Sequence, residues 1–345
     1  MGAFALLGDI KLGLDIFQNS YHPDAAYQVQ RLTELQSKIS PEFHDTFFNS
    51  SSGVYFSGLQ TEQALPLYLG VVPSSVRDSV LSKLIGDIQM TQKNHTTSGI
   101  IGIKYLMEVL SLYDRGDVAL DLALQTTYPS WGYMIHSKYE PATTVWELWE
   151  SDTAGPEMNS RNHHMFGSIL GWFYKHVAGI TPLDPGYSRV RIQPNLLRHD
   201  NFTIKFATPR GDIHLNYTKQ EYPRHKHSNS ESSTIEFAYN ITLPPCTSGT
   251  FHIPIAMDDR EVTHSNSEFV TNIDVEVSGV PIWRDWEFLS GVEGIQNVER
   301  IGNYLRVGFS NGRFRFLVTA SKVKEMPELM HSTRFDRTNL DSTIS

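Results

Sequence analysis

Apolar residues recur every three or four positions along the first half of the chain, which is the spacing of one face of an α-helix. This spacing predicts helices over residues 4–17, 25–39, 76–88, 102–113, 117–126 and 164–178. The third of these follows Pro73-Ser74, a pair with the composition of a helix N-cap. No convincing strand pattern separates the helices, so an alternating βαβ layout is excluded.

After residue 188 the period of the apolar pattern changes to two, as in half-buried β-strands. Strands are predicted at the segments RVRI, FTIKF, DIHLNY, STIEFAYNITL, NIDVEV, NYLRVGF and RFRFLV, all within residues 189–318. Turn sequences such as Asn311-Gly312 separate them, and residues 219–233 form a polar connection. The pattern therefore predicts seven or eight short antiparallel strands.

These two patterns predict a multidomain chain, with α-helices first and β-strands second. Consecutive helices in this number are typical of a toroid or barrel of helical hairpins, and the strands are typical of an antiparallel β-sandwich. We place the helical domain at residues 1–181 and the β-sandwich at 182–321. Residues 322–345 lack a clear period and are expected to form a poorly ordered tail.

Composition narrows the classes of partner. The formal charge is −9, which argues against nucleic acid and against an anionic membrane surface. No run approaches the roughly 18 apolar residues that span a bilayer. Asp9, Lys11 and Asp15 interrupt the apolar start, so we do not expect it to be a signal peptide. A helix that begins at Met1 without a cap is expected of a chain cut from a longer protein.

Five Asn-x-Ser/Thr sequons favour a secreted protein, although a cytoplasmic one remains an open alternative. The sequons begin at Asn49, Asn94, Asn201, Asn216 and Asn240. The single cysteine, Cys246, forms neither an intrachain disulfide nor a cysteine metal site.

One stretch, TTVWELWESDTAGPEMNSRNHH at residues 143–164, concentrates the side chains that bind and cleave sugars. Trp146 and Trp149 offer aromatic faces for the apolar face of a sugar ring. Glu147 and Glu150 supply carboxylates of the kind that hydrolyse glycosidic bonds. The alternative is that the tryptophans belong to the core and the glutamates are solvated. A helix would put each pair on one face, whereas a loop would let all four line a cleft.

Other chemistries fit the sequence poorly. His95, His163 and His164 lack the regular spacing of metal ligands, and there is no HExxH motif, so we expect no metal. The sequence also lacks a Walker A motif, a GxGxxG motif after a strand and a GxSxG elbow. We therefore expect no cofactor.

Five segments in order resemble the bacterial-type α-L-rhamnosidases, glycoside hydrolase family 78. They are YFSGLQTEQALPLYLGVVP (55–73), HTTSGIIGIKYL (95–106), QTTYPSWGYM (125–134), ATTVWELWE (142–150) and MNSRNHHMFGSILGWFYKHVAGI (158–180). The resemblance implies that the helices are the C-terminal portion of an (α/α)6 barrel. It also implies that the barrel releases terminal α-L-rhamnose from rhamnosides with inversion and without a cofactor.

The resemblance implies roles for single residues. Glu147 matches the general base that deprotonates the attacking water, and Glu150 has at most a supporting role. The remaining positions, expected to contact the sugar, are Trp146, Trp149, Asn162, His163, Trp131, Tyr133 and His95.

One departure from the family pattern changes the expected activity. The family's general acid lies in a segment with a Gly-Trp-x-Gly-Asp signature, and these 345 residues contain no such signature. We therefore expect the chain alone to be inactive. The alternatives are a non-catalytic protein that binds rhamnosyl glycans or serves a structural role, and a related barrel hydrolase or lyase with another sugar preference.

Overall fold

The computed structural model describes residues 2–155, 157, 159–195, 200–222, 233–254, 257–258, 269–284, 287–289, 291–301 and 304–323. Two compact units make up the chain. The first extends to Leu170 and is helical, and the second begins at Gly171 and is built from β-sheets. The helical domain followed by antiparallel sheets confirms the predicted fold class, and the predicted ranges 1–181 and 182–321 stay a prediction.

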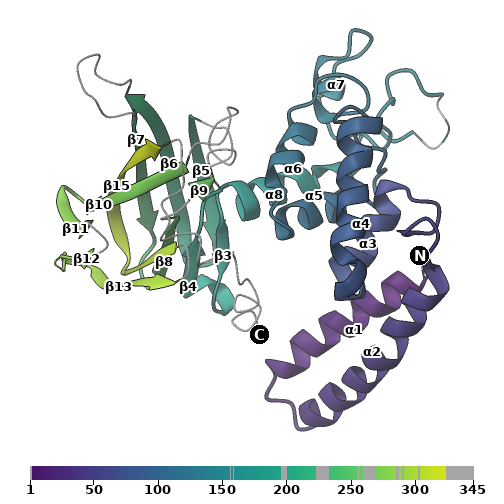
Figure 1. Cartoon of the computed structure of the whole chain (residues 1–345), viewed down its shortest axis with the longest axis horizontal. Helices are drawn as coiled ribbons and strands as arrows, with labels where there is room; N and C mark the ends of the chain where they lie inside the picture. Colours follow the sequence, from purple (N-terminus) through teal and green to yellow (C-terminus); the bar gives the residue numbers. More distant parts are fainter. Residues whose placement is uncertain are drawn as a thin grey trace. The chain divides into compact units, whose positions relative to one another are not determined.

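Helices in hairpins build the first unit (Figure 1). Those of regular α-helical form are α1 (Gly2–Gln18), α2 (Ala25–Phe47), α3 (Gln60–Leu69), α4 (Ser74–Gly86), α5 (Ile103–Leu112), α6 (Gly116–Ala123), α7 (Trp131–His136) and α8 (Ser168–Trp172). A π-helical turn, η1 (Asp87–Thr91), extends α4, and a small two-stranded sheet pairs β1 (Phe48–Asn49) with β2 (Val54–Tyr55). Helix α1 lies against α2, and α3 lies against α5.

Helix α3 shows how the sequence sets the ends of these helices. The Glu62 carboxylate accepts hydrogen bonds from the main-chain N–H groups of Ser57 (2.9 Å) and Leu59 (3.1 Å), so the donors just before the helix are satisfied. Gly70 ends the helix with a φ of +74°, the left-handed conformation that glycine adopts without a steric penalty. The helix thereby presents Gln60 and Gln63 to the interior, where both are buried.

Three details of the helical half refine or correct the predictions. Within the predicted pair, Pro73 is the N-cap of α4 and makes no side-chain hydrogen bond, and Ser74 is the first residue of the helix. The predicted helix over 164–178 is divided into a 3₁₀ turn η2 (His164–Gly167), α8 and a π-helical turn η3 (Phe173–Val177). The segment at 125–134, for which no helix is predicted, contains the start of α7.

Two sheets form the second unit. The larger has the strand order β12 (Glu287–Phe288), β11 (Val280–Arg284), β10 (Phe269–Val277), β15 (Gly312–Val323), β7 (Ser233–Leu243), β6 (Gly211–Tyr222) and β5 (Asn201–Thr208), with β9 (Met257–Asp258) paired to β10. The smaller has the order β13 (Ile295–Ile301), β14 (Tyr304–Phe309), β8 (Ser248–Pro254), β4 (Arg189–Ile192) and β3 (Ile180–Pro182). A 3₁₀ turn, η4 (Pro185–Tyr187), connects β3 to β4.

Apolar side chains from both sheets form one core, which makes this unit a β-sandwich. Phe251 of β8 packs edge-on against Phe316 of β15 with ring centroids 4.8 Å apart, and against Tyr239 of β7 at 4.9 Å. The alternation along β8 places Phe251 and Ile253 inside and His252 between them on the other side. The period-two pattern of the sequence is therefore the pattern of burial.

The β half also corrects the sequence predictions. One pair, β4 with β8, is parallel, so the smaller sheet is not entirely antiparallel. Residues 219–222 continue β6 and residue 233 begins β7, so the predicted loop over 219–233 is wrong at both ends, and residues 223–232 lie outside the described residues. Strand β15 includes Lys322 and Val323, whereas the rest of the predicted tail, 324–345, also lies outside them.

Candidate active site

Two extended segments pair to hold the centre of the candidate site. The main-chain N–H of Glu147 donates to the carbonyl oxygen of Ser160 (2.9 Å), and the N–H of His163 donates to that of Val145 (2.8 Å). The hydroxyl of Thr144 donates to the carbonyl oxygen of Arg161. Residues 144–147 thus form irregular structure beside 160–163, so this part of the chain is a loop and not a helix.

The Glu147 carboxylate is fixed by the main chain of the opposing segment. Its Oε2 accepts a hydrogen bond from the N–H of Ser160 at 2.9 Å. Because Glu147 also donates its own N–H to Ser160, both its backbone and its side chain are tied to one residue. Glu147 is half-buried, so this bond orients its carboxylate while the group stays within reach of solvent. Ser160 was not among the residues predicted for the site.

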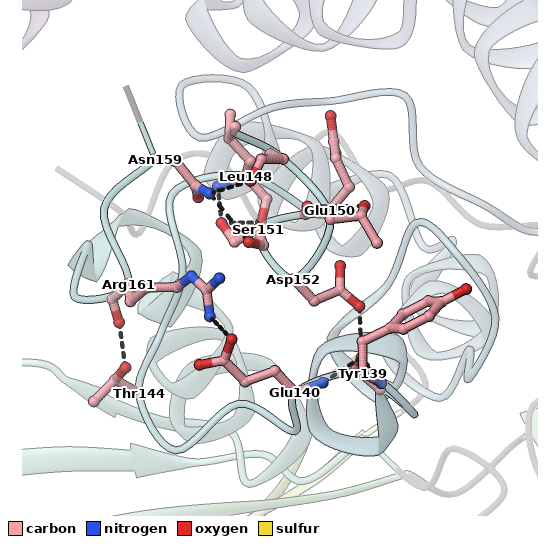
Figure 2. A network of polar contacts seen from close by, with 12 residues as sticks. Tyr139, Glu140, Thr144, Leu148, Glu150, Ser151, Asp152, Asn159 and Arg161 are labelled. Atoms are coloured by element: carbon pink, nitrogen blue, oxygen red, sulfur yellow. Dashed lines mark hydrogen bonds and ion pairs between the residues drawn. The ribbon is translucent and has the colours of Figure 1, made fainter. Parts of the chain in front are cut away.

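The loop that leads from Glu147 back to Ser160 is closed by Asn159 (Figure 2). The Asn159 side-chain amide lies within hydrogen-bonding distance of three carbonyl oxygens, those of Ser151 (3.0 Å), Gly155 (3.1 Å) and Ala154 (3.3 Å). The buried Ser151 hydroxyl donates to the carbonyl oxygen of Leu148 (3.1 Å). Short polar side chains therefore supply hydrogen-bond partners to main-chain groups that have none from a helix or sheet.

Trp149 and Trp131 lie in an aromatic cluster with Phe166. The Trp149 ring is 3.9 Å from that of Phe166 and meets Trp131 edge-on at 5.2 Å. Both indole N–H groups donate to main-chain oxygens, Trp149 to Ser98 and Trp131 to Phe166, each at 2.9 Å. Trp149 is only 7% exposed, so it serves as packing in this unit, and its predicted contact with a sugar stays a prediction.

Trp146 is covered as well, with an exposed fraction of 2%. The guanidinium of Arg161 lies over its ring, 5.5 Å from the centroid. Arg161 also pairs with the Glu140 carboxylate at 2.5 Å, as Figure 2 shows. One face of the Trp146 ring therefore contacts a cation. Neither Arg161 nor Glu140 was predicted, since nothing in the linear sequence brings residues 21 positions apart together.

Histidines and an asparagine flank this centre. His163 is half-buried and its ring is nearly parallel to that of His164, with centroids 5.9 Å apart. Its Nδ1 is buried and has no hydrogen-bond partner among the described residues. Asn162 is exposed, and its main-chain N–H donates to the Ser160 hydroxyl (3.2 Å). These positions remain predicted contacts of the sugar.

His95 is held by its own loop. Its Nδ1 lies 2.9 Å from the carbonyl oxygens of Gln92 and Lys93, which requires a proton on that nitrogen, and its Nε2 lies 2.8 Å from the Thr127 hydroxyl. Both ring nitrogens are thus engaged with the protein. His95 ties two of the segments that carry the family resemblance, 95–106 and 125–134, and its role as a sugar contact stays a prediction.

A buried glutamine that was not among the predicted site residues joins two further segments. Gln60 of α3 donates to Asp87 Oδ2 (3.0 Å) and to the carbonyl oxygen of His95 (3.1 Å), and it accepts from the N–H of Thr97 (2.9 Å). Gly102 follows, where any larger residue would collide with the Thr61 side chain. The resemblance segments 55–73 and 95–106 therefore meet through hydrogen bonds and close backbone approach.

Two tyrosines bind the carboxylates that follow Glu147. The Tyr128 hydroxyl donates to Glu150 (3.0 Å), and Tyr133 donates to Asp152 Oδ2 (2.9 Å), which also accepts from Ser137 (2.5 Å). Burial, and then these bonds to carboxylates, raise the pKa of both tyrosines, so they remain donors. Tyr133 thus positions Asp152, a carboxylate within residues 143–164 that was not among the predicted site residues.

The arrangement suits acid–base chemistry on a neutral ligand. Across the described residues no group of three or more histidine, cysteine or acidic side chains is placed to hold a metal ion. A carboxylate fixed by a main-chain donor beside aromatic and amide groups is the kind of centre that activates water. In the same part of the chain, no helix is both long and apolar enough to cross a bilayer.

Comparisons with known proteins place these segments in a family. Residues 21–177 match the bacterial α-L-rhamnosidase six-hairpin glycosidase domain. The chain is 30% identical to an α-L-rhamnosidase of Streptomyces avermitilis over 244 residues, 69% of this chain and 22% of that protein. It is 34% identical to one from an Alteromonas species over 198 residues, 56% of this chain and 21% of that protein.

Solved structures agree with the sequence relatives. An α-L-rhamnosidase from Dictyoglumus thermophilum superimposes with a TM-score of 0.65 at 28% identity, over 85% of this chain and 29% of that chain. The Streptomyces avermitilis α-L-rhamnosidase in complex with L-rhamnose superimposes with a TM-score of 0.63 at 25% identity, over 85% of this chain and 25% of that chain. The chain thus spans about a fifth of the length of the curated relatives that it matches. Its residues 21–177 belong to the six-hairpin glycosidase domain of the bacterial-type α-L-rhamnosidases.

Proposed function

We propose that this chain is part of a glycoside hydrolase that releases terminal α-L-rhamnose with inversion, and that Glu147 is its general base. The family match supports the substrate class. The observation that carries the role of Glu147 is the hydrogen bond from the Ser160 N–H to its carboxylate, because it holds one oxygen in place and leaves the other to act.

The reaction needs one bond made and one broken at the anomeric carbon. The Glu147 carboxylate takes a proton from water as the water oxygen attacks that carbon from the face opposite the leaving group. The glycosidic bond breaks, and its oxygen takes a proton from a second carboxyl group acting as general acid. The product sugar therefore has the opposite anomeric configuration, β-L-rhamnose.

We propose that the second carboxyl group is not supplied by these 345 residues. The resemblance assigns it to a segment with the Gly-Trp-x-Gly-Asp signature, which this sequence lacks. A general acid contributes about 10²- to 10⁴-fold to such a reaction. The chain by itself is accordingly expected to hydrolyse rhamnosides slowly or not at all.

Product analysis tests the proposed function. The protein as its own organism makes it is incubated with p-nitrophenyl α-L-rhamnopyranoside, and proton NMR follows the first anomer released. The proposal predicts β-L-rhamnose, with no turnover of the matching α-D-glucopyranoside. Early release of α-L-rhamnose would overturn inversion, and turnover of the glucoside alone would overturn the substrate class.

A second candidate is a protein that binds rhamnosyl glycans without cleaving them. It is favoured by the missing Gly-Trp-x-Gly-Asp signature, since one carboxylate is not sufficient for the inverting reaction. This candidate predicts that L-rhamnose binds, whereas no rhamnoside is hydrolysed by the protein in the form its organism makes.

A further inference from the structure

The family resemblance assigns Trp146 to the wall of a sugar site, yet Trp146 is 2% exposed. A sugar packs its C–H face on an indole ring, and that contact requires an open ring face. The group that lies over the ring is the guanidinium of Arg161, 5.5 Å from the centroid. The group over this ring therefore lies at the surface, since the Arg161 side chain is itself 37% exposed.

The backbone of Arg161 is anchored, whereas its side chain is held weakly. Thr144 binds the Arg161 carbonyl oxygen, and the neighbouring Ser160 pairs with Glu147. The guanidinium, by contrast, is held by the Trp146 ring and by Glu140, whose side chain is 62% exposed. Exposed ion pairs and exposed cation–π contacts are each weak. The side chain can therefore rotate away without disturbing the segment that holds Glu147.

The position of Glu140 is set by the network drawn in Figure 2. The Asp152 carboxylate accepts from the Ser137 hydroxyl (2.5 Å), and that hydroxyl in turn accepts from the N–H of Glu140 (3.3 Å). The loop that carries Glu140 is therefore tied to Asp152, five residues beyond Glu147. This tie keeps the Glu140 carboxylate beside Arg161 while leaving it solvated.

We propose that Arg161 is a specificity-determining residue that covers the sugar-binding face of Trp146 and is displaced when rhamnose binds. The inference rests on the proposed function, because it takes L-rhamnose as the ligand. Arg161 lies where the sugar would stack, so sugar and guanidinium compete for one ring face. The Glu140 carboxylate stabilises the covered state. D-glucose carries a hydroxymethyl group where L-rhamnose has its C6 methyl group, so D-glucose should gain less from opening the ring face.

The competition fixes the sign of the mutational effects. Arg161→Ala removes the cover, so the affinity for L-rhamnose should rise about ten-fold, the effect of losing two weak surface contacts. Glu140→Gln weakens the covered state without removing the guanidinium, so the rise should be about three-fold. Arg161→Met loses the same two contacts but keeps an apolar stem over the ring, so the rise should be smaller than in Arg161→Ala.

Two readouts on the 345-residue chain test the proposal. The chain is labelled with 5-fluorotryptophan, the Trp146 resonance is assigned from Trp146→Phe, and its solvent exposure is measured by fluorine NMR with a soluble paramagnetic agent. L-rhamnose and, as a control, D-glucose are then titrated against the same resonance. Circular dichroism verifies that each variant is folded.

The expected result is a Trp146 resonance that is shielded in the parent chain, exposed in Arg161→Ala, and shifted by L-rhamnose at lower concentration in that variant. Weaker L-rhamnose binding in Arg161→Ala would overturn the proposal and make Arg161 a sugar contact. A Trp146 resonance as shielded in Arg161→Ala as in the parent chain would overturn the proposal that Arg161 covers the ring. Exposure of Trp146 with no L-rhamnose binding in any variant would overturn its sugar-binding role, while hydrolysis through Glu147 is tested separately by product analysis.

Discussion

The two units of the chain are stabilised in different ways. In the second, buried side chains are almost all apolar and come from both sheets, and Thr247 is its one buried polar residue among those described. In the described part of the first, the buried polar residues are Gln60, Gln63, Thr96, Ser98, Ser130, Ser137 and Ser151. The β-sandwich is stabilised by burial of apolar surface. In the helical unit, buried side chains also form hydrogen bonds that hold its loops in place.

This difference identifies the unit whose loops are held in fixed places by buried side chains. Buried polar groups are costly unless they are paired, so a unit that contains several of them must hold particular loops in particular places. Gln60 binds the loop at 95–97, and Ser137 binds Asp152 beyond Glu147. The β unit has no such network of buried side chains in the described residues and provides stability. The following predictions test this contrast.

The largest expected effect is in the apolar core of the β unit. Phe316 is fully buried and packs against Phe251 and Phe309. Phe316→Ala should lower the free energy of unfolding by about 3–5 kcal/mol, because it removes apolar contacts and leaves a cavity. Denaturant melts measure the loss. The control is Phe288→Ala, at a residue that is 50% exposed, and an equal effect of both changes would contradict a core-based stability.

A pH-dependent effect follows from His252 on β8. Burial, and then the charges of Arg191 and Arg306, lower its pKa to about 4 from the ordinary 6.5, with Glu299 opposing them. The unfolded chain therefore binds a proton between these pH values and the folded chain does not, so stability falls as the pH drops from about 6.5 to 4. The shift corresponds to about 3 kcal/mol.

Denaturant melts between pH 4 and 7 check this dependence. His252→Gln removes the titrating group and should flatten the curve over this range, because no proton is then taken up at that position. His214→Gln, at an exposed histidine on β6, is the matched control and should leave the curve unchanged. A curve that stays equally steep in His252→Gln would show that another group is responsible.

The smallest of these effects is the one most specific to the helical unit. Gln60→Leu removes a buried amide and leaves the N–H of Thr97 and the carbonyl oxygen of His95 without their partner. The expected loss is about 2 kcal/mol, with faster hydrogen exchange at Thr97. Gln30→Leu, at an exposed position of α2, should change little. If Gln60→Leu left the free energy of unfolding unchanged or raised it, buried hydrogen bonds would not stabilise the helical unit, and the contrast with the β unit would be wrong.

The sequence predicted the β half through its apolar period and the helical half through its stripes, since burial follows these patterns directly. It missed β8 and β11 because SGTFHIP and VPIWR contain glycine and proline, which mask the alternation. It named Glu147 and the two tryptophans as a group. It could not find Ser160, Arg161 or Gln60, because their roles depend on which loops meet in space, and linear spacing does not contain that information.

The central claim is that the carboxylate held by Ser160 performs the chemistry of the helical unit. The most direct measurement is the rate of rhamnoside hydrolysis by the protein as its organism makes it, compared with Glu147→Gln and with Glu157→Gln, an exposed glutamate in the same loop. The account predicts a fall in kcat of about 10²- to 10⁴-fold for Glu147→Gln and no change for Glu157→Gln. An unchanged kcat in Glu147→Gln would contradict it.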